Sequence, residues 1–273
     1  MNPYNKPSPQ AYLVHHGIKG QKWGVRRFQN KDGSLTSAGK TRYYEESDKI
    51  IQTNKDGSKT IPKGFVMNRV GKASKDVNKS GALYMSYGKD DAARYVKSLG
   101  PTPLGKLFGT AGEAVQHISA KSNLQMPSDK DVAIETAKLL RSDEKLFNSF
   151  KDSFYSYAVS TDDITEDTIR KALADPEGRS GQKLAYGIST FLGDPNYADE
   201  SKIVYDHFRQ KGYDVIPDLH DRLSGTSNTA MIVINPDKVE VTSYTTITKD
   251  VYRAGRDYVK SLGKLPISDL IKD

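Results

Sequence analysis

Hydrophobic residues recur with a strand-like pattern in several short stretches of the chain, either alternating with polar residues or forming brief apolar runs. These stretches, each predicted as a β-strand, cover residues 65–70, 82–87, 115–118, 213–216, 231–234 and 239–246. The sequence Asn-Lys-Asp-Gly-Ser at Asn54–Ser58 lies between Ile50-Ile51 and Thr60-Ile61. An Asp-Gly turn between two apolar pairs predicts a β-hairpin.

Helical spacing of apolar residues dominates the middle of the chain. A first helix is predicted over residues 90–99, where Gly100-Pro101 is a stop signal. Ser128 with Asp131 resembles a helix N-cap and opens a helical block that extends to about Gly212. The further helices predicted in this block cover residues 144–155, 165–174, 181–192 and 200–211, and the polar stretch 249–273 is also helical in character. Strands before and after a helical block predict an α+β fold.

Composition narrows the class of protein. The 273 residues are 36% hydrophobic and 27% charged, which predicts a folded centre with polar extensions. The absence of cysteine excludes disulfides and thiolate metal sites. No apolar run approaches the roughly 18 residues of a membrane helix, and the start MNPYNKPSPQ lacks the order of a secretory signal. We therefore expect neither a membrane partner nor export by an encoded signal.

Positive charge is concentrated at the N-terminus. Residues 1–45 hold eight Lys or Arg against two acidic residues, a net +6 out of the +7 of the whole chain. The segment His15–Asn30 contains the only tryptophan and has no helical or strand period, which favours a contact surface over a solvated arm without a partner. Side chains that could stack on bases or fill an apolar pocket are Trp23 and Phe28, beside Lys22, Arg26 and Arg27.

Other candidate chemistry is weaker. Neighbouring side chains of an extended chain point to opposite sides, so His15 and His16 favour a packing or contact role over a metal site. Asp218, His220 and Asp221 could form an acid–base set, but no nucleophile motif accompanies them. His207 shares the apolar side of its predicted helix and is interpreted as a core or boundary residue.

The N-terminal motif carries a specific resemblance. The sequence HHGIKGQKWGVRRFQNKDGSLTSAGKTRY at His15–Tyr43 closely resembles a motif of structural and head-associated proteins of tailed bacteriophages and prophages, chiefly those of Gram-positive bacteria. The resemblance implies that the protein is present in the virion, and in the host cytoplasm during assembly or after ejection. It also implies that residues 1–45 are an anchoring module for capsid or portal proteins, or for packaged DNA. The candidate partner-binding residues are His16, Lys22, Trp23, Arg26, Arg27 and Phe28.

Residues 64–241 resemble, more loosely, the ADP-ribosyltransferase-like domains of such phage proteins. That family implies small antiparallel sheets with a helical block, here over residues 46–248, with 249–273 as a C-terminal tail. In the family an Arg on an early strand holds the dinucleotide NAD, and a Ser on the next strand supports its nicotinamide side. A Glu before a late strand orients the ribose hydroxyl and stabilises the oxocarbenium-like transition state. Arg69 and Ser86 match the first two positions.

The third position departs from the family. By its spacing to Ile232–Pro236, the place of the glutamate falls at Asn228. A missing carboxylate removes electrostatic stabilisation of the developing positive charge, which lowers the rate by about 100-fold or more. Asp218 and Asp221 lie upstream and could replace it, which makes Asp221 the alternative catalytic candidate.

Three functions stay open at this point. The leading hypothesis is a minor virion protein whose ADP-ribosyltransferase-like domain has doubtful activity. The first alternative is an active mono-ADP-ribosyltransferase that modifies a host protein with NAD. The second is a DNA-binding capsid or ejected protein.

Overall fold

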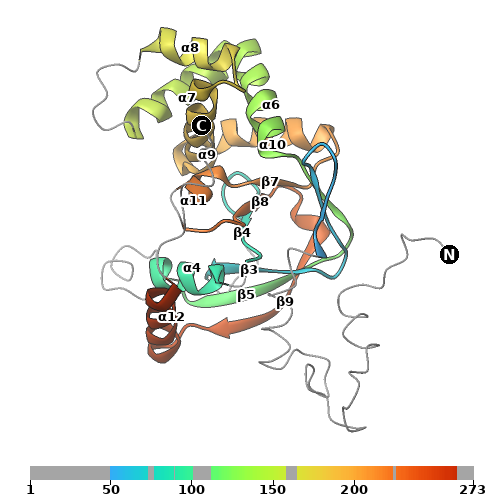
Figure 1. Ribbon diagram of the computed structural model, residues 1–273, viewed down its shortest axis with the longest axis vertical. Helices are drawn as coiled ribbons and strands as arrows, with labels where there is room; N and C mark the ends of the chain where they lie inside the picture. Colours follow the sequence, from blue (N-terminus) through green and yellow to red (C-terminus); the bar gives the residue numbers. More distant parts are fainter. Residues whose placement is uncertain are drawn as a thin grey trace, which may run out of the picture.

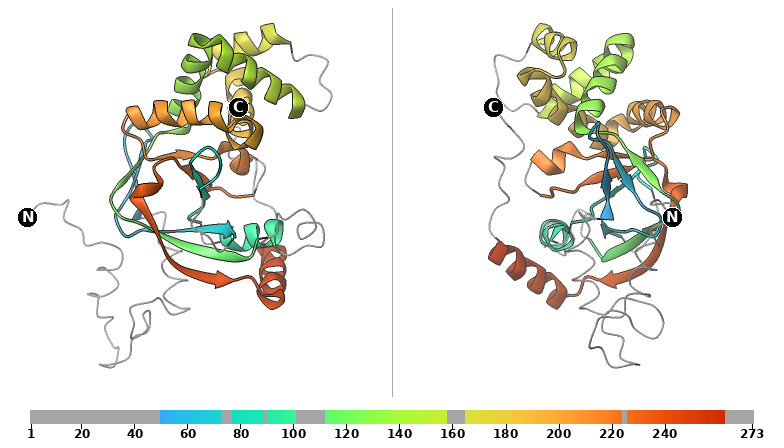
Figure 2. Two further views of the ribbon diagram at one scale, coloured as in Figure 1. Left: turned by 180° about the vertical axis from the view of Figure 1, so that it is seen from behind. Right: turned by 45° about the vertical axis from the view of Figure 1, so that its right-hand side comes forward.

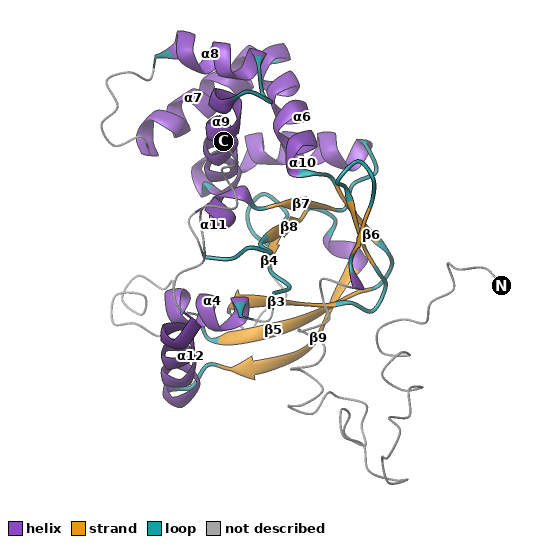
Figure 3. Cartoon of the chain, in the orientation of Figure 1, coloured by secondary structure: helices purple, strands orange, loops and turns teal. Residues whose placement is uncertain are grey.

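The fold is α+β, with small antiparallel sheets below a lobe of helices (Figure 1). The structure, a computed structural model, describes residues 50–72, 77–88, 90–100, 112–157, 165–223 and 226–262. Figure 3 distinguishes these helices, strands and loops by colour. The predicted α+β class, with small antiparallel sheets and a helical block, is thereby confirmed, while the N-terminal segment His15–Asn30 lies outside the described residues.

The strands form three sheets, each antiparallel throughout. The hairpin sheet has the order β1-β2-β6 and contains β1 (Gln52–Thr53), β2 (Lys59–Ile61) and β6 (Leu124–Met126). The long sheet has the order β3-β5-β9 and contains β3 (Val66–Gly71), β5 (Ala114–Ala120) and β9 (Val239–Thr246). The short sheet has the order β4-β8-β7 and contains β4 (Leu83–Met85), β7 (Val215–Pro217) and β8 (Met231–Val233).

The long and short sheets meet at one bridge between β3 and β4. Asn68 and Ser86 exchange both backbone hydrogen bonds, with N···O distances of 2.8 and 2.9 Å. Across this bridge the strand order runs β7-β8-β4-β3-β5-β9. Away from it the sheets diverge, and a hydrophobic core that includes Met67, Met85 and Val233 fills the space between them. We call the place where β3, β4 and β8 meet the sheet junction.

Residues 129–210 form a helical lobe. It comprises α6 (Asp129–Ser142), α7 (Glu144–Tyr157), α8 (Glu166–Ala174), α9 (Arg179–Gly193), the 3-10 turn η1 (Pro195–Tyr197) and α10 (Ala198–Gln210). The Ser128 hydroxyl accepts a hydrogen bond from the amide of Asp131, so the predicted N-cap is confirmed. Asp143 similarly accepts from the amide of Leu146 at 3.0 Å, where α7 begins.

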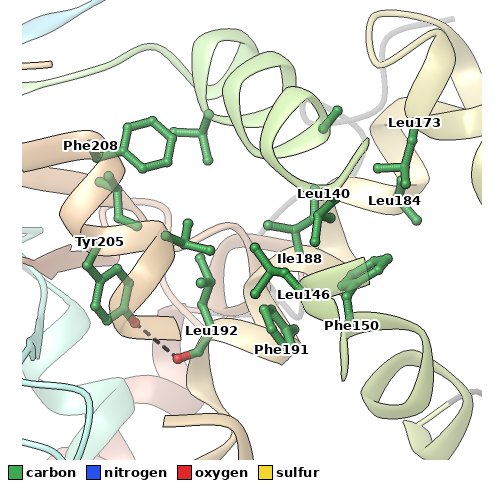
Figure 4. Close-up of a cluster of buried hydrophobic side chains, with 14 of the residues drawn as sticks. Leu140, Leu146, Phe150, Leu173, Leu184, Ile188, Phe191, Leu192, Tyr205 and Phe208 are labelled. Atoms are coloured by element: carbon green, nitrogen blue, oxygen red, sulfur yellow. Dashed lines mark hydrogen bonds between the residues drawn. The ribbon is translucent and has the colours of Figure 1, made fainter. Parts of the chain in front are cut away.

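Aliphatic and aromatic side chains together fill the core of the lobe (Figure 4). The rings of Phe150 and Phe191 meet edge to face at a centroid distance of 5.7 Å. The Tyr205 hydroxyl donates to the carbonyl of Leu192 at 3.0 Å. The same core includes Ile216 and the short-sheet residues around it, so the lobe covers one face of the short sheet.

Two further helices pack on the outer face of the long sheet, as the views of Figure 2 show. These are α4 (Asp91–Leu99) and α12 (Lys249–Leu262), which contact each other. Val96, Val115 and Ile247 form their shared buried cluster. The described part of the predicted tail is therefore a helix, as expected, and it packs against the domain through the buried side chain of Val259.

Most predicted elements are confirmed, including the hairpin turn. The amide of Asn54 donates to the carbonyl of Ser58 at 2.8 Å, and Gly57 takes a positive φ of 82° that favours glycine. His207 is half-buried and contacts Glu135 at 3.2 Å, in keeping with a boundary role. Elements that the pattern did not predict are β6, α11 (Leu219–Leu223) and the 3-10 turns η1 and η2 (Pro236–Lys238). Within the described ranges, no helix combines the length and apolar character needed to cross a membrane.

Candidate functional site

The sheet junction gathers the three positions that the sequence singled out. Arg69 lies on β3, Ser86 directly follows β4, and Asn228 lies three positions before the first residue of β8. Met85 pairs with Met231, and continuing this register by three places sets Asn228 opposite Gly88. The fold therefore brings Asn228 to the end of the strand that carries Ser86.

Arg69 and Ser86 are neighbours without sharing a face. Asn68 is the residue paired with Ser86, and adjacent side chains of a strand point to opposite faces. Arg69 therefore projects from the other face of β3, in a row with Gln116 and Tyr244. It is half-buried, whereas Ser86 is fully buried. A ligand that contacts both residues must lie across the strand ends.

Ser86 is one of several buried polar residues whose side chains lack a hydrogen-bond partner in the described ranges. Its hydroxyl has no hydrogen-bond partner among the described residues. Burial of an unsatisfied hydroxyl costs about 1–3 kcal/mol. Beside it, Asn68 Oδ1 contacts His117 Nδ1 at 2.9 Å, and His117 Nε2 contacts Thr245 Oγ1 at 3.0 Å. The polar surroundings and the unsatisfied hydroxyl make Ser86 a candidate contact for a polar ligand.

Asn228 is exposed and lies in a segment tied to the end of β4. Thr229 Oγ1 accepts from the amides of Tyr87 at 3.1 Å and Gly88 at 2.6 Å, and donates to Asp91. The Ser227 hydroxyl also donates to Asp91, at 2.5 Å. Burial raises the pKa of Asp91, and the hydrogen bonds from Ser227 and Thr229 act against that rise. The sequence analysis missed Asp91, Ser227 and Thr229, because no local pattern marks them.

Asp221, the alternative catalytic candidate, lies on α11, and its side chain is hydrogen-bonded by a residue of α4. The Tyr95 hydroxyl donates to its carboxylate. Asp218, one turn earlier, is buried, and its pKa is raised to about 7 by that burial and by repulsion from Asp221. His220 contacts Thr190 of α9 at 3.0 Å, so the side chains of His220 and Asp221 are engaged by different helices, while Asp218 accepts from the amide of Asp221.

The chemistry available here is electrostatic. The segment that carries Asp218, Asp221 and Asn228 connects β7 to β8, and the backbone carbonyl of Asp221 accepts from the amides of Thr226 and Ser227 at 3.0 and 3.1 Å. A fixed carboxylate stabilises positive charge that develops on a sugar ring. Among the described residues, no group of three or more His, Asp or Glu side chains could hold a metal ion.

The predicted partner-binding residues fall outside the described residues. They are His16, Lys22, Trp23, Arg26, Arg27 and Phe28.

Comparison with known proteins adds one finding. Residues 6–30 match the model of a family of unknown function, DUF7211. No curated protein and no solved structure matches the chain. The family match overlaps the basic segment His15–Asn30 and ends before the first described residue.

Proposed function

We propose that this chain is a minor virion protein of a tailed phage or prophage whose residues 46–248 form an ADP-ribosyltransferase-like domain that binds NAD. The observation that carries the proposal is the meeting of β3, β4 and β8, which gathers Arg69, Ser86 and Asn228 at the sheet junction. Arg69 supplies a cation for the diphosphate of the dinucleotide, and the Ser86 hydroxyl supplies a polar contact on the nicotinamide side. The two fit NAD because an extended dinucleotide can reach both faces across the strand ends.

Attachment to the particle is assigned to the N-terminal segment. Residues 1–45 carry a net charge of +6 and include Trp23, which suits an acidic or partly apolar surface on a capsid or portal protein. The family match over residues 6–30 covers part of this segment and none of the described residues. Mass spectrometry of purified virions should detect the protein, and its absence from particles would overturn the structural role.

The domain binds NAD but cleaves it slowly. Departure of nicotinamide leaves positive charge on the ribose, and the Asn228 amide offers a dipole where a carboxylate is needed. Asp221 supplies negative charge from α11, where the Tyr95 hydroxyl restrains it. We assign transfer to a host protein as a residual activity of the domain.

Binding is tested by calorimetry with the full chain and NAD. Arg69→Ala should weaken binding by about 10-fold or more, because it removes a charged hydrogen-bonding partner of the diphosphate. Arg256→Ala is the matched control, since Arg256 lies on α12 with its side chain 43% exposed and pairs only locally with Asp257. Lack of NAD binding by the unaltered chain would overturn the proposal.

Restoring the carboxylate tests the assignment of position 228. Asn228→Glu should raise the rate of NAD hydrolysis by about 100-fold, with labelled NAD and host lysate used to detect transfer. Asn196→Glu makes the same change at an exposed position in η1 and should leave the rate unchanged. If the protein binds NAD and Asn228→Glu gains nothing, position 228 is not the place of the glutamate.

Packaged DNA is a second candidate partner, favoured by the charge asymmetry of the chain. Phosphate-driven binding weakens steeply with salt and should be lost when Lys22, Arg26 and Arg27 are replaced by Ala. An affinity that does not change with salt would instead indicate a protein pocket that receives Trp23.

A further inference from the structure

The segment Ser227–Thr229 is held by a hydrogen-bond network whose direction is fully determined. Thr229 Oγ1 accepts from the amides of Tyr87 and Gly88, and Ser227 Oγ accepts from the amide of Thr229 at 3.1 Å. Each hydroxyl has a single proton, and both protons are donated to Oδ2 of Asp91. Asp91 therefore acts as the acceptor that completes the network.

The packing around this network is close. A Cβ atom on Gly88 would lie 2.8 Å from Asp91 Oδ2 and 3.0 Å from Thr229 Oγ1. Such distances are too short for a side chain, so only glycine lets the backbone approach the two groups. The network and the glycine thus join two segments of the chain that are far apart in sequence. Asp91 lies 136 residues before Ser227 and 138 residues before Thr229.

Stabilising the start of α4 does not explain the burial of Asp91. A carboxylate in the first turn of a helix interacts favourably with the helix dipole while exposed to solvent. Asp250 occupies that place in α12, and its side chain is 92% exposed. Asp91 occupies the first turn of α4 but is only 5% exposed. Burial of a carboxylate is costly, and here its hydrogen bonds go to the segment that carries Asn228.

We propose that Asp91 is a positioning residue, which fixes residue 228 opposite the end of β4 through Ser227 and Thr229. The role at the NAD site rests on the proposed function, whereas the ordering of the segment does not. A site whose groups are fixed before the ligand arrives loses less free energy on ordering. Asp91 thereby keeps the third position of the site at a set distance from Ser86.

Two substitutions break the network in different ways. Asp91→Asn removes the negative charge to which both hydroxyls donate, and in one of its two orientations the amide directs its donors at Thr229 Oγ1, whose two acceptor sites are already used. Thr229→Val keeps the shape of the side chain and removes its hydroxyl, and so it tests the proposal even if the Asp91 variant fails to fold. Thr229→Ser retains the hydroxyl and is the conservative variant, while Asp250→Asn is the matched control for loss of a first-turn carboxylate.

Hydrogen exchange measured by mass spectrometry on the protein without ligand is the first readout. Asp91→Asn and Thr229→Val should speed exchange of the amides at 228–230 by about 10- to 100-fold. Thr229→Ser should restore most of the protection, and Asp250→Asn should leave it unchanged. Unchanged exchange at 228–230 in both disrupting variants would overturn the proposal, regardless of whether the protein binds NAD.

The second readout is NAD hydrolysis in the Asn228→Glu background. A positioning role predicts that adding Asp91→Asn lowers kcat by about 10-fold or more while KM changes less. Faster exchange with kcat unchanged would overturn the positioning role and leave Asp91 a purely structural residue. Faster exchange in a protein that binds no NAD would overturn the proposed function and support the ordering of the segment by Asp91.

Discussion

The helical lobe and the sheet junction are both buried, but they bury different kinds of side chain. The lobe encloses Phe147, Phe150 and Phe191 with their aliphatic neighbours. The junction encloses hydroxyls and carboxylates, among them Ser86, Asp91 and Asp218, each at most 5% exposed. Apolar burial stabilises a fold, whereas polar burial costs free energy unless the groups are satisfied. The lobe also buries polar side chains, such as Thr136 and Asp194, so the difference between the two regions is one of degree.

The carboxylates of the two regions show the same contrast. Glu135 on α6 is partly buried, which acts to raise its pKa, but hydrogen bonds from Lys138, Lys211 and His207 outweigh burial and lower the pKa to about 2. Asp218 at the junction has a pKa of about 7, raised by burial and by Asp221. Glu135 in the lobe is therefore held ionised by its cationic partners, whereas Asp218 at the junction is about half protonated near pH 7.

The largest expected effect comes from opening a cavity in the lobe. Phe150→Ala removes a ring that packs against Phe191 and should lower the free energy of unfolding by about 3–5 kcal/mol. Tyr155→Ala, at a position on the same helix that is 39% exposed, should cost much less. Urea unfolding measures both. A similar loss in the two variants would contradict the assignment of stability to the lobe core.

An intermediate effect on the free energy of unfolding is expected from the titration of Asp218 at the junction. The folded-state pKa of Asp218 lies above its unfolded value near 4, so the folded state binds the extra proton and loses stability as pH rises toward 7. Between pH 5 and pH 7 the loss from this group should be about 2 kcal/mol. Asp218→Asn should remove that loss, as measured by urea unfolding at both pH values. An equal pH dependence in the variant would show that Asp218 is not the group responsible.

The smallest effect is expected at the surface of the lobe. Lys171 and Asp167 form an ion pair of 2.6 Å with side chains 75% and 70% exposed. Solvent screens such pairs, so Lys171→Ala should change the free energy of unfolding by no more than about 0.5 kcal/mol. A double-mutant cycle with Asp167→Ala, measured at low and high salt, isolates the pair. A coupling energy above about 1 kcal/mol would contradict this expectation and show that surface ion pairs also contribute substantially to the stability of the lobe.

Much of the fold could be predicted from the sequence because its signals are local. Ser128 with Asp131 marks the start of α6, and the Asp-Gly turn at Asn54–Ser58 marks the hairpin. β9 was predicted with its observed bounds, Val239–Thr246. β6 and α11 are short, and they were missed because, unlike the equally short β4, β7 and β8, neither lies in a longer apolar stretch of the sequence.

The site could be predicted only in part. The spacing to Ile232–Pro236 assigned Asn228, and the structure brings this residue to the end of β4 as the register requires. The part played by Asp91 could not be predicted, because its partners lie 136 and 138 residues away in the chain. The sequence also gave no indication that Arg69 and Ser86 project from different faces, which depends on the pairing of Asn68 with Ser86.

The helical lobe leaves and re-enters the sheets at a single place. The amide of Asp214 donates to the carbonyl of Gln125 at 2.9 Å, and the Asp214 carboxylate accepts from the amide of Gln125 at 3.1 Å. The lobe is thus an insertion whose two ends are fastened together. A change in the length of the helices at its far end therefore need not move the strands. The side chains that pack on Ile216 and Ile232, and those that fill the lobe's own core, must stay apolar.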